Sequence, residues 1–193
     1  MLIVATNGRT GPRTSCTEIG EDPEWGGEFL VDISTPPRRQ RAARHVAPMV
    51  ERCARKGFDA VEFDNLDSWT RFDGTDLEGQ VPFGQDEAVA FAESLTDYTH
   101  SVGLAVGQKN TPQLGAETSI DVVGFDFAIA EECGYFDECE SYTDVFGDDV
   151  IVIEYTEEGF RCACDSVGAD VSVVLRDVDV TVPGSETYLY DSC

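Results

Sequence analysis

The first residue that could do chemistry is a carboxylate placed directly after a strand-like segment. Asp64 follows the apolar stretch of the run GFDAVEFDNLDSW, and Asn65 and Asp67 come just behind it. The end of a buried parallel strand delivers a side chain to the mouth of a sheet, where a carboxylate can act as nucleophile, acid or base. Asp and Asn also build turns at strand ends, so for Asn65 and Asp67 both interpretations stay open.

A second pair of carboxylates ends another apolar segment. Glu131 and Glu132 follow the stretch FDFAIA, so one of them should point into the mouth of the sheet and the other away from it. A carboxylate surrounded by Phe127, Ile129 and Tyr135 would be partly desolvated, as suits a general acid. An exposed loop acid in an acidic protein is the competing interpretation.

Glycoside hydrolysis needs at least two carboxylates that face one cavity, and two different strands can supply them. One protonates the leaving oxygen, and the other attacks the anomeric carbon or activates water. Between the two acidic runs, the stretch GLAVGQKN supplies a cation and an amide, Lys109 and Asn110. These side chains could orient Asp64 or bind sugar hydroxyls, and Lys109 could equally neutralise a buried acid.

The elements that must position these residues alternate between strand and helix. The predicted strands are 2–5, 28–33, 59–63, 103–107, 125–130, 150–154 and 171–175. They are near-continuous apolar runs, as expected for strands covered on both faces. Helices are predicted at 38–56, where Pro48 should break or restart the helix, and at 86–102, which Gly103 should end. This alternation predicts a parallel sheet with right-handed crossovers.

The polar residues at the strand ends favour a barrel over a doubly wound sheet. They are Asp32, Asp64, Asn65, Lys109, Asn110, Glu131, Glu132, Glu154, Tyr155, Arg176 and Asp177. The segment TNGRTG after the first strand lacks a glycine-rich phosphate-binding pattern. We therefore predict a single domain, 1–193, with the (β/α)8 TIM-type barrel fold. Because such barrels usually need about 250 residues, the first one or two strands should be absent or altered.

The charge balance is strongly acidic. Thirteen basic against 38 acidic residues give a formal net charge of −25, and lysine occurs only at Lys56 and Lys109. This balance argues against nucleic acid and anionic membranes as partners. It suits a cationic polymer as ligand, and it equally suits a protein kept soluble in salty surroundings. No apolar run is long enough to span a membrane, and the opening residues do not form a secretory signal.

Seven cysteines are many for a chain of this size and fit an oxidising compartment. The odd number leaves at least one thiol without an intramolecular partner. A zinc site is disfavoured because the sequence has no CxxC pair, and neither His45 nor His100 lies near a cysteine. We expect no metal and no cofactor.

Four linked segments resemble the signature motifs of a known family. GFDAVEFDNLDSW, GLAVGQKN, FDFAIAEECGYFDEC and VIVIEY are similar, in this order and spacing, to the endo-α-1,4-polygalactosaminidases of glycoside hydrolase family 114. The resemblance covers roughly residues 25–193 and includes WGGEFLVDI with Asp32. It implies a TIM-type barrel, a secreted enzyme, and hydrolysis of α-1,4-linked galactosamine in a partly deacetylated galactosaminogalactan.

The resemblance also implies roles for individual residues. Asp64 and Glu131 fall on the family's catalytic carboxylates, and we take Asp64 as nucleophile and Glu131 as general acid/base. The expected substrate-binding residues are Asp32, Asn65, Asp67, Lys109, Asn110, Glu132, Tyr135, Glu154 and Tyr155. The chain departs from the family at Glu132, where an amide is usual, and throughout 1–24.

Two disulfides and two alternative functions complete the expectations. Cys133 with Cys139 would bracket the loop after Glu131, and Cys193 would pair with Cys162 or Cys164. A non-catalytic carbohydrate-binding barrel is the alternative to an enzyme. A calcium-binding acidic protein is a third possibility, which no EF-hand-like loop supports.

Overall fold

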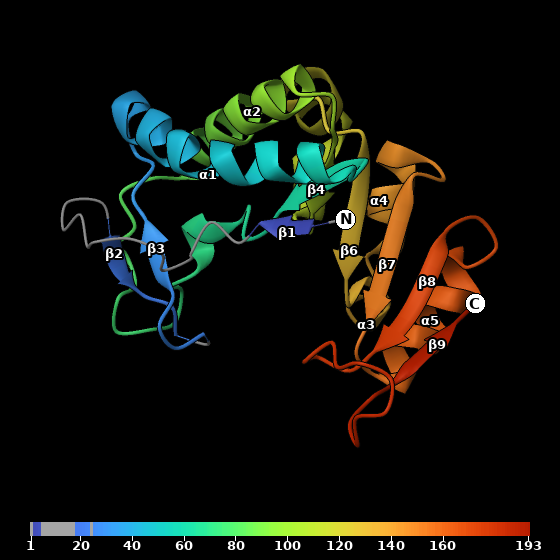
Figure 1. The fold of residues 1–193 in the computed structure, drawn as a ribbon. Helices are drawn as coiled ribbons and strands as arrows, with labels where there is room; N and C mark the ends of the chain where they lie inside the picture. The colour runs from blue at the N-terminus through green and yellow to red at the C-terminus, as the bar shows by residue number, and fades with distance from the viewer. Residues whose placement is uncertain (1, 5–17, 24) are drawn as a thin grey trace. The chain divides into compact units, whose positions relative to one another are not determined.

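The computed structural model describes residues 2–4, 18–23 and 25–193 of the chain (Figure 1). Cys16 and most of the altered start expected within 1–24 lie outside the described residues. The chain forms two compact units, Met1–Val106 with Val122–Gly124, and Gly107–Asp121 with Phe125–Cys193. The single domain expected from the sequence stays a prediction.

The first unit contains a short parallel strand pair, a hairpin and two long helices. Its elements are β1 (Leu2–Val4), β2 (Glu18–Glu21), β3 (Phe29–Val31), α1 (Pro36–Lys56), β4 (Ala60–Phe63), the 3-10 helix η1 (Ser68–Thr70), α2 (Gln85–Ser101) and the beginning of β5 (Ala105–Lys109). β1 pairs in parallel with β4, with Leu2 opposite Val61. The amide of Ala105 donates to the carbonyl of Asp59 at 3.0 Å, so β5 enters beside the start of β4.

The segment 28–33 is not a strand of the parallel sheet, and this prediction was wrong. β3 pairs antiparallel with β2, with Glu18 opposite Val31 and Glu21 opposite Phe29. The connection contains Gly27, whose φ of 89° lies in the left-handed region that glycine adopts without strain. An apolar run of this length does not reveal its pairing partner, and the preceding EIGE segment is too polar to be read as a strand.

The two long helices of the first unit lie side by side (Figure 1). α1 buries Val46, Val50 and Cys53, which are spaced by four and three residues on one face. The helix runs unbroken through Pro48, so the predicted break was wrong. A proline removes only one amide donor, and packing of the apolar face holds the helix on both sides of it. α2 ends at Ser101 close to the predicted boundary, and Gly103 follows with a φ of 84°.

The second unit is a parallel sheet with helices packed against it. It comprises the end of β5, the 3-10 helix η2 (Pro112–Leu114), most of the π-helix η3 (Glu117–Val123), β6 (Phe127–Glu131), α3 (Cys133–Phe136), α4 (Cys139–Phe146), β7 (Val150–Glu154), α5 (Glu157–Val167), β8 (Ser172–Arg176) and β9 (Tyr190–Ser192). Strands β5 to β8 pair in parallel in chain order, and β9 pairs antiparallel with β8. The predicted mixed α/β fold with a central parallel sheet is therefore present.

Packing in the second unit depends on small residues. A Cβ on Gly107 would lie 2.6 Å from the ring of Phe127, so the ring occupies the space that a side chain on β5 would take.

α4 contacts β6 and β7, and α5 contacts β7 and β8, so these helices cover the sheet (Figure 1). The disulfide Cys164–Cys193 ties α5 to the residue after β9, which selects one of the two predicted pairings.

Candidate active site

In the second unit, the carboxylate of Glu131 is held by three side chains from neighbouring strands. The ammonium of Lys109 lies 2.7 Å from Oε2 of Glu131. Nδ2 of Asn110 donates to the same oxygen at 3.3 Å, and the hydroxyl of Tyr155 donates to Oε1 at 2.5 Å. Each donor stands at or just beyond the carboxyl end of β5 or β7, on either side of β6. The structure thus brings together three of the expected substrate-binding residues around one of the expected catalytic ones.

Asn110 also fixes the backbone at Glu131. The amide of Glu131 donates to Oδ1 of Asn110 at 2.8 Å, so the Asn110 side chain bonds both the main chain and the carboxylate of one residue. Lys109 is only 4% exposed, whereas 26% of the Glu131 side chain is exposed. The cation is therefore buried, and the carboxylate keeps a surface that a ligand can reach.

A buried glutamine, which the sequence analysis missed, shapes this turn. Nε2 of Gln108 donates to the carbonyls of Asn110 and Thr111 at 2.9 and 3.1 Å. Both residues have left-handed backbones, with φ of 52° and 61°. The side chain of Gln108 thus satisfies two carbonyls that the sharp turn removes from the sheet. The only sequence signal for Gln108 was its position directly before Lys109 on a predicted strand. Side chains alternate between faces along β5, so Gln108 and Lys109 point to opposite faces.

Left-handed backbone recurs where the candidate residues stand. Asn65 follows Asp64 with φ of 59°, and Glu132 follows Glu131 with φ of 57°. Such conformations are uncommon outside glycine and concentrate at functional sites, where they turn the chain sharply enough to present a neighbouring side chain. The turns after β4, β5 and β6 therefore share one local geometry.

The two residues at the end of β7 face opposite sides. Tyr155 reaches Glu131, whereas Glu154 is completely buried. Oε1 of Glu154 accepts from the amide of Gly134 at 2.6 Å, and Oε2 has no hydrogen-bond partner. Glu154 was expected to bind substrate, but its side chain has no exposed surface with which to contact a sugar. It instead holds the start of α3, directly behind the Glu131 loop.

Burial shifts the pKa of Glu154. Desolvation raises the pKa of this carboxyl above its ordinary value, and the amide of Gly134 opposes the rise. The carboxylate of Glu132 raises the pKa further, and the amide of Tyr135 lowers it. The net direction is upward, which favours a neutral carboxyl at a site closed to water.

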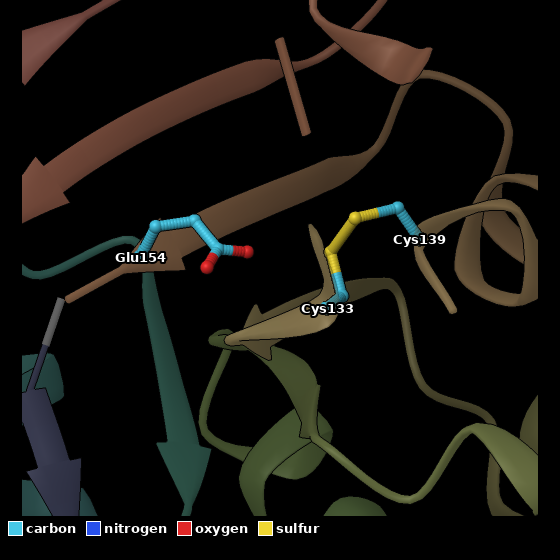
Figure 2. A group of neighbouring side chains, drawn as sticks. All are labelled: Cys133, Cys139 and Glu154. Atoms are coloured by element: carbon cyan, nitrogen blue, oxygen red, sulfur yellow. A yellow bond between two sulfur atoms is a disulfide. The ribbon is translucent and has the colours of Figure 1, made fainter. Parts of the chain in front are cut away.

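The disulfide Cys133–Cys139 lies next to this buried carboxyl. It closes the six-residue interval after the Glu131 loop, and its pairing was predicted. Figure 2 shows the Glu154 side chain extending toward the two sulfur atoms, and the potential ligand atoms of the three residues lie within 4.8 Å of one another. Because the sulfurs are bonded to each other, they are not thiolates and offer no ligand of the kind that zinc prefers.

In the first unit, Asp64 is half-buried at the end of β4. Its Oδ1 accepts from the amide of Asn65 at 2.9 Å, which closes the turn. Asp67 stands one turn later, before η1, and its carbonyl accepts from the amide and the hydroxyl of Thr70 at 3.0 Å each. The side chains of Asp64 and Asn65 therefore start from a turn whose backbone is fixed locally.

A carboxyl that the sequence analysis did not single out lies near Asp64. Burial raises the pKa of Glu28, and the carboxylates of Asp22 and Asp64 raise it further. The guanidinium of Arg71 opposes this rise, and it also binds Asp22 through two bonds of 2.6 and 2.9 Å. Glu28 is thus a second acid in the electrostatic surroundings of Asp64. The WGGEF run contains it, but no strand-end position marked it.

Three further expected residues have other surroundings. Asp32 accepts from the amide of Ser34 at 2.9 Å and pairs with Arg38 at 2.7 Å, so it bonds the start of α1. Glu132 donates its amide to the carbonyl of Ile153 at 2.8 Å and begins α3. Tyr135 is 55% exposed and packs edge-on against Phe136, so its ring is available to a ligand.

Comparisons with known proteins identify a family and similar folds. The model of glycoside-hydrolase family GH114 matches residues 13–193. The crystal structure of Aspergillus fumigatus Ega3 in complex with galactosamine is similar over 99% of this chain and 77% of that chain, with a TM-score of 0.75 and 21% identity. The glycoside hydrolase domain of PelA from Pseudomonas aeruginosa is similar over 95% and 79%, with a TM-score of 0.62 and 12% identity. At these identities the likeness shows the fold. No curated protein matches the chain.

Proposed function

Because the chain belongs to glycoside-hydrolase family GH114, we propose that it hydrolyses an α-1,4-linked galactosamine polymer with Asp64 and Glu131 as catalytic carboxylates. Its membership makes it a glycoside hydrolase. The observation that carries the proposal is the Glu131 carboxylate, which three side chains hold while it stays accessible. A carboxylate held in one orientation is what positioned acid or base catalysis requires.

The proposed mechanism divides the work between the two carboxylates. Asp64 attacks the anomeric carbon, while Glu131, in its protonated form, transfers its proton to the glycosidic oxygen as the bond to the leaving sugar breaks. Glu131 then takes a proton from the water that hydrolyses the glycosyl-enzyme intermediate. Tyr155 and Asn110 keep the Glu131 carboxyl oriented through both steps, and Lys109 supplies positive charge beside it. This sequence retains the anomeric configuration, so the stereochemistry of the released product tests it.

The substrate and the surroundings follow from the same family membership. Ega3 has been crystallised with galactosamine, which supports an amino-sugar substrate for this chain. A polymer with free amines is cationic, and a formal net charge of −25 would attract it. Among the described residues, no helix is long and apolar enough to cross a membrane. We propose that the enzyme is extracellular, where its disulfides persist, and that its strands form a TIM-type barrel.

Amide substitutions of the two carboxylates test the function. Asp64→Asn and Glu131→Gln should each lower the release of oligosaccharides from a partly deacetylated α-1,4-galactosamine polymer by about 10²–10⁴-fold. Circular dichroism should show both variants folded. Asp64→Asn should keep the wild-type melting temperature, whereas Glu131→Gln should lower it, because it removes the negative charge paired with the buried Lys109. Near-normal cleavage by both variants would contradict the assignment. Binding of the polymer by the wild type without any product would point to a carbohydrate-binding protein instead of an enzyme.

A further inference from the structure

The chain concentrates its positive charge on one helix. Seven of its 13 basic residues lie in the 21 residues of α1, which contains one acidic residue, Glu51. The rest of the chain holds 6 basic and 37 acidic residues. The basic residues of α1 are Arg38, Arg39, Arg41, Arg44, Arg52, Arg55 and Lys56. A strongly acidic protein therefore carries a cationic helix.

Five of these residues lie on the exposed side of α1 in two groups, Arg41 with Arg44 and Arg52 with Arg55 and Lys56. We call Arg41, Arg44, Arg52, Arg55 and Lys56 the cationic stripe, and all five are exposed. Because an α-helix turns by about 100° per residue, the four arginines lie on the side opposite the buried Val46, Val50 and Cys53, and Lys56 lies at the edge of that side. From Arg41 to Lys56 the stripe extends about 22 Å, at about 1.5 Å per residue.

Few acids of the described chain neutralise this stripe. Within the stripe, Arg55 contacts Glu51 at 3.4 Å, and both side chains are largely exposed. Such a surface pair contributes little binding energy. Arg41, Arg44, Arg52 and Lys56 make no ion pair with any described residue. Four cations thus stand in solvent, available to an external anion.

We propose that the cationic stripe is a docking site for a linear acidic polysaccharide with carboxylate groups along its length. Two groups of cations, about 12 Å apart along one side of a helix, fit a thin, extended polyanion. Arginine also binds carboxylates through two parallel hydrogen bonds, which a lysine cannot do. The stripe has four arginines and one lysine.

The proposed function gives this docking site a use. The proposed substrate is a polysaccharide that bears amines. Acidic polymers in its surroundings would attract it, because their charges are opposite. An enzyme that binds such an acidic polymer through α1 would be concentrated where its cationic substrate lies. The acidic surface of the enzyme would attract the substrate itself. The inference rests on the proposed function for this use, but the docking of the polyanion does not depend on catalysis.

Charge argues against two other occupants. A second copy of the chain brings a net charge of −25, so two copies repel each other over most of their surfaces. A DNA duplex is wide and carries about one negative charge per 1.7 Å of its axis, so it would contact acidic surface beyond a single helix. A thin single-chain polyanion can contact α1 alone, and therefore meets less acidic surface than either of these.

Binding to sodium polygalacturonate tests the proposal. We expect the wild type to bind with an affinity that falls linearly with salt on a double-logarithmic plot. The triple variant Arg41→Gln, Arg44→Gln, Arg52→Gln should reduce that slope by about three, by analogy with about one released counterion per neutralised phosphate. Arginine and glutamine are similar helix formers, so circular dichroism should confirm an unchanged fold.

A matched pair of single variants separates the stripe from net charge. Arg52→Gln and Arg161→Gln each remove one exposed cation, from α1 and α5 respectively. Only Arg52→Gln should weaken binding and lower the salt slope by about one. Equal effects of the two variants, or equal binding of neutral dextran, would overturn the proposal.

Further outcomes concern the occupant and the link to catalysis. Tighter binding of single-stranded DNA than of polygalacturonate would overturn the choice of a polysaccharide. Self-association at low salt in sedimentation, lost in the triple variant, would replace the polysaccharide by a second copy. The Glu131→Gln chain should bind polygalacturonate like the wild type. A wild type that fails to cleave galactosamine polymers but binds polygalacturonate through α1 would contradict the proposed function and leave the docking site intact.

Discussion

Glu131 and Glu154 are the last residues of adjacent strands, yet their surroundings are opposite. Glu131 ends β6, keeps 26% of its side chain exposed and accepts from three side chains. Glu154 ends β7, is completely buried and accepts from one backbone amide. The register of the two strands explains the difference. Glu131 lies opposite Ile153, so these two side chains share a face, and Glu154 is one residue further along β7. Successive side chains of a strand alternate between faces.

The comparison separates two uses of one side chain. On one face of the sheet, a glutamate meets cationic and hydroxyl donors and can take part in chemistry. On the other face, a glutamate meets α3 and α5, where burial raises the pKa of its carboxyl. Position at a strand end is therefore insufficient to identify a catalytic acid, and the face of the strand decides its role.

Identical substitutions at the two positions should give the largest contrast. Glu131→Gln should lower kcat by about 10²–10⁴-fold, since positioned acid–base catalysis is lost. Glu154→Gln should leave kcat close to the wild-type value, because its side chain does not reach the substrate. Initial rates on a galactosamine polymer measure both, with circular dichroism as the control for folding. Equal losses in the two variants would show that the faces are not functionally distinct.

A second substitution at Glu154 tests its role behind the loop. Glu154→Leu removes the acceptor of the Gly134 amide and leaves that donor buried, which should lower the free energy of unfolding by about 1–3 kcal/mol. Glu154→Gln keeps a carbonyl acceptor and should be destabilised much less. Chemical denaturation measures both values. If leucine proved as stable as glutamine, the bond to Gly134 would not stabilise the loop.

Removing the Tyr155 hydroxyl should have a smaller effect on activity. Tyr155→Phe deletes the donor to Oε1 of Glu131 but leaves Lys109 and Asn110 in place. We expect kcat to fall about tenfold, which corresponds to about 1.4 kcal/mol and is typical of a lost bond to a charged group. KM should change little, since the substitution affects orientation of the acid. Tyr98→Phe, which deletes a hydroxyl that donates to the exposed carboxylate of Glu51 at 2.8 Å, is the matched control. A Tyr155→Phe enzyme with wild-type kcat would refute the orienting role.

The pH dependence of stability should show the smallest effect. The pKa of Glu154 is raised in the folded state, so the folded protein binds this proton more tightly than the unfolded chain does. The free energy of unfolding should then be highest below the unfolded-state pKa and fall as pH rises through the folded-state pKa. Glu154→Gln should lack this decline, so the variant should gain stability relative to the wild type as pH rises. Parallel curves from denaturation at several pH values would contradict the buried, neutral carboxyl.

Sequence patterns predicted most of the strands, the two long helices and the Glu131 surroundings better than they predicted faces and pairing. Lys109, Asn110 and Tyr155 were expected near the catalytic acids because parallel strands end at one edge. The orientation of Glu154 could not be predicted, since VIVIE is apolar throughout and shows no alternation from which a face could be read. The strand at 28–33 was placed in the wrong sheet for a related reason. Strand pairing depends on distant chain segments, and an apolar run does not itself indicate which strand it pairs with.

The missed residues act through contacts that a linear pattern does not reveal. Gln108 bonds two carbonyls of the following turn, and Glu28 comes near Asp64 only because β2 and β3 form a hairpin. The cationic stripe was visible as a run of arginines. The net charge of the whole chain concealed it, because a sum over all residues discards their position. Only the exposed face of α1 shows that the cations are aligned.

The fit between Glu154 and Gly159 has an evolutionary consequence. A Cβ on Gly159 would stand 2.1 Å from Oε2 of Glu154, so no other residue fits at 159 while the glutamate occupies its present rotamer. Gly134 is equally confined, since its Cβ would meet the carbonyl of Gly159 at 2.3 Å. We therefore expect positions 134, 154 and 159 to vary together among descendants of a common ancestor. A lineage that replaces the glutamate by a shorter residue should be the one in which alanine becomes admissible at 159.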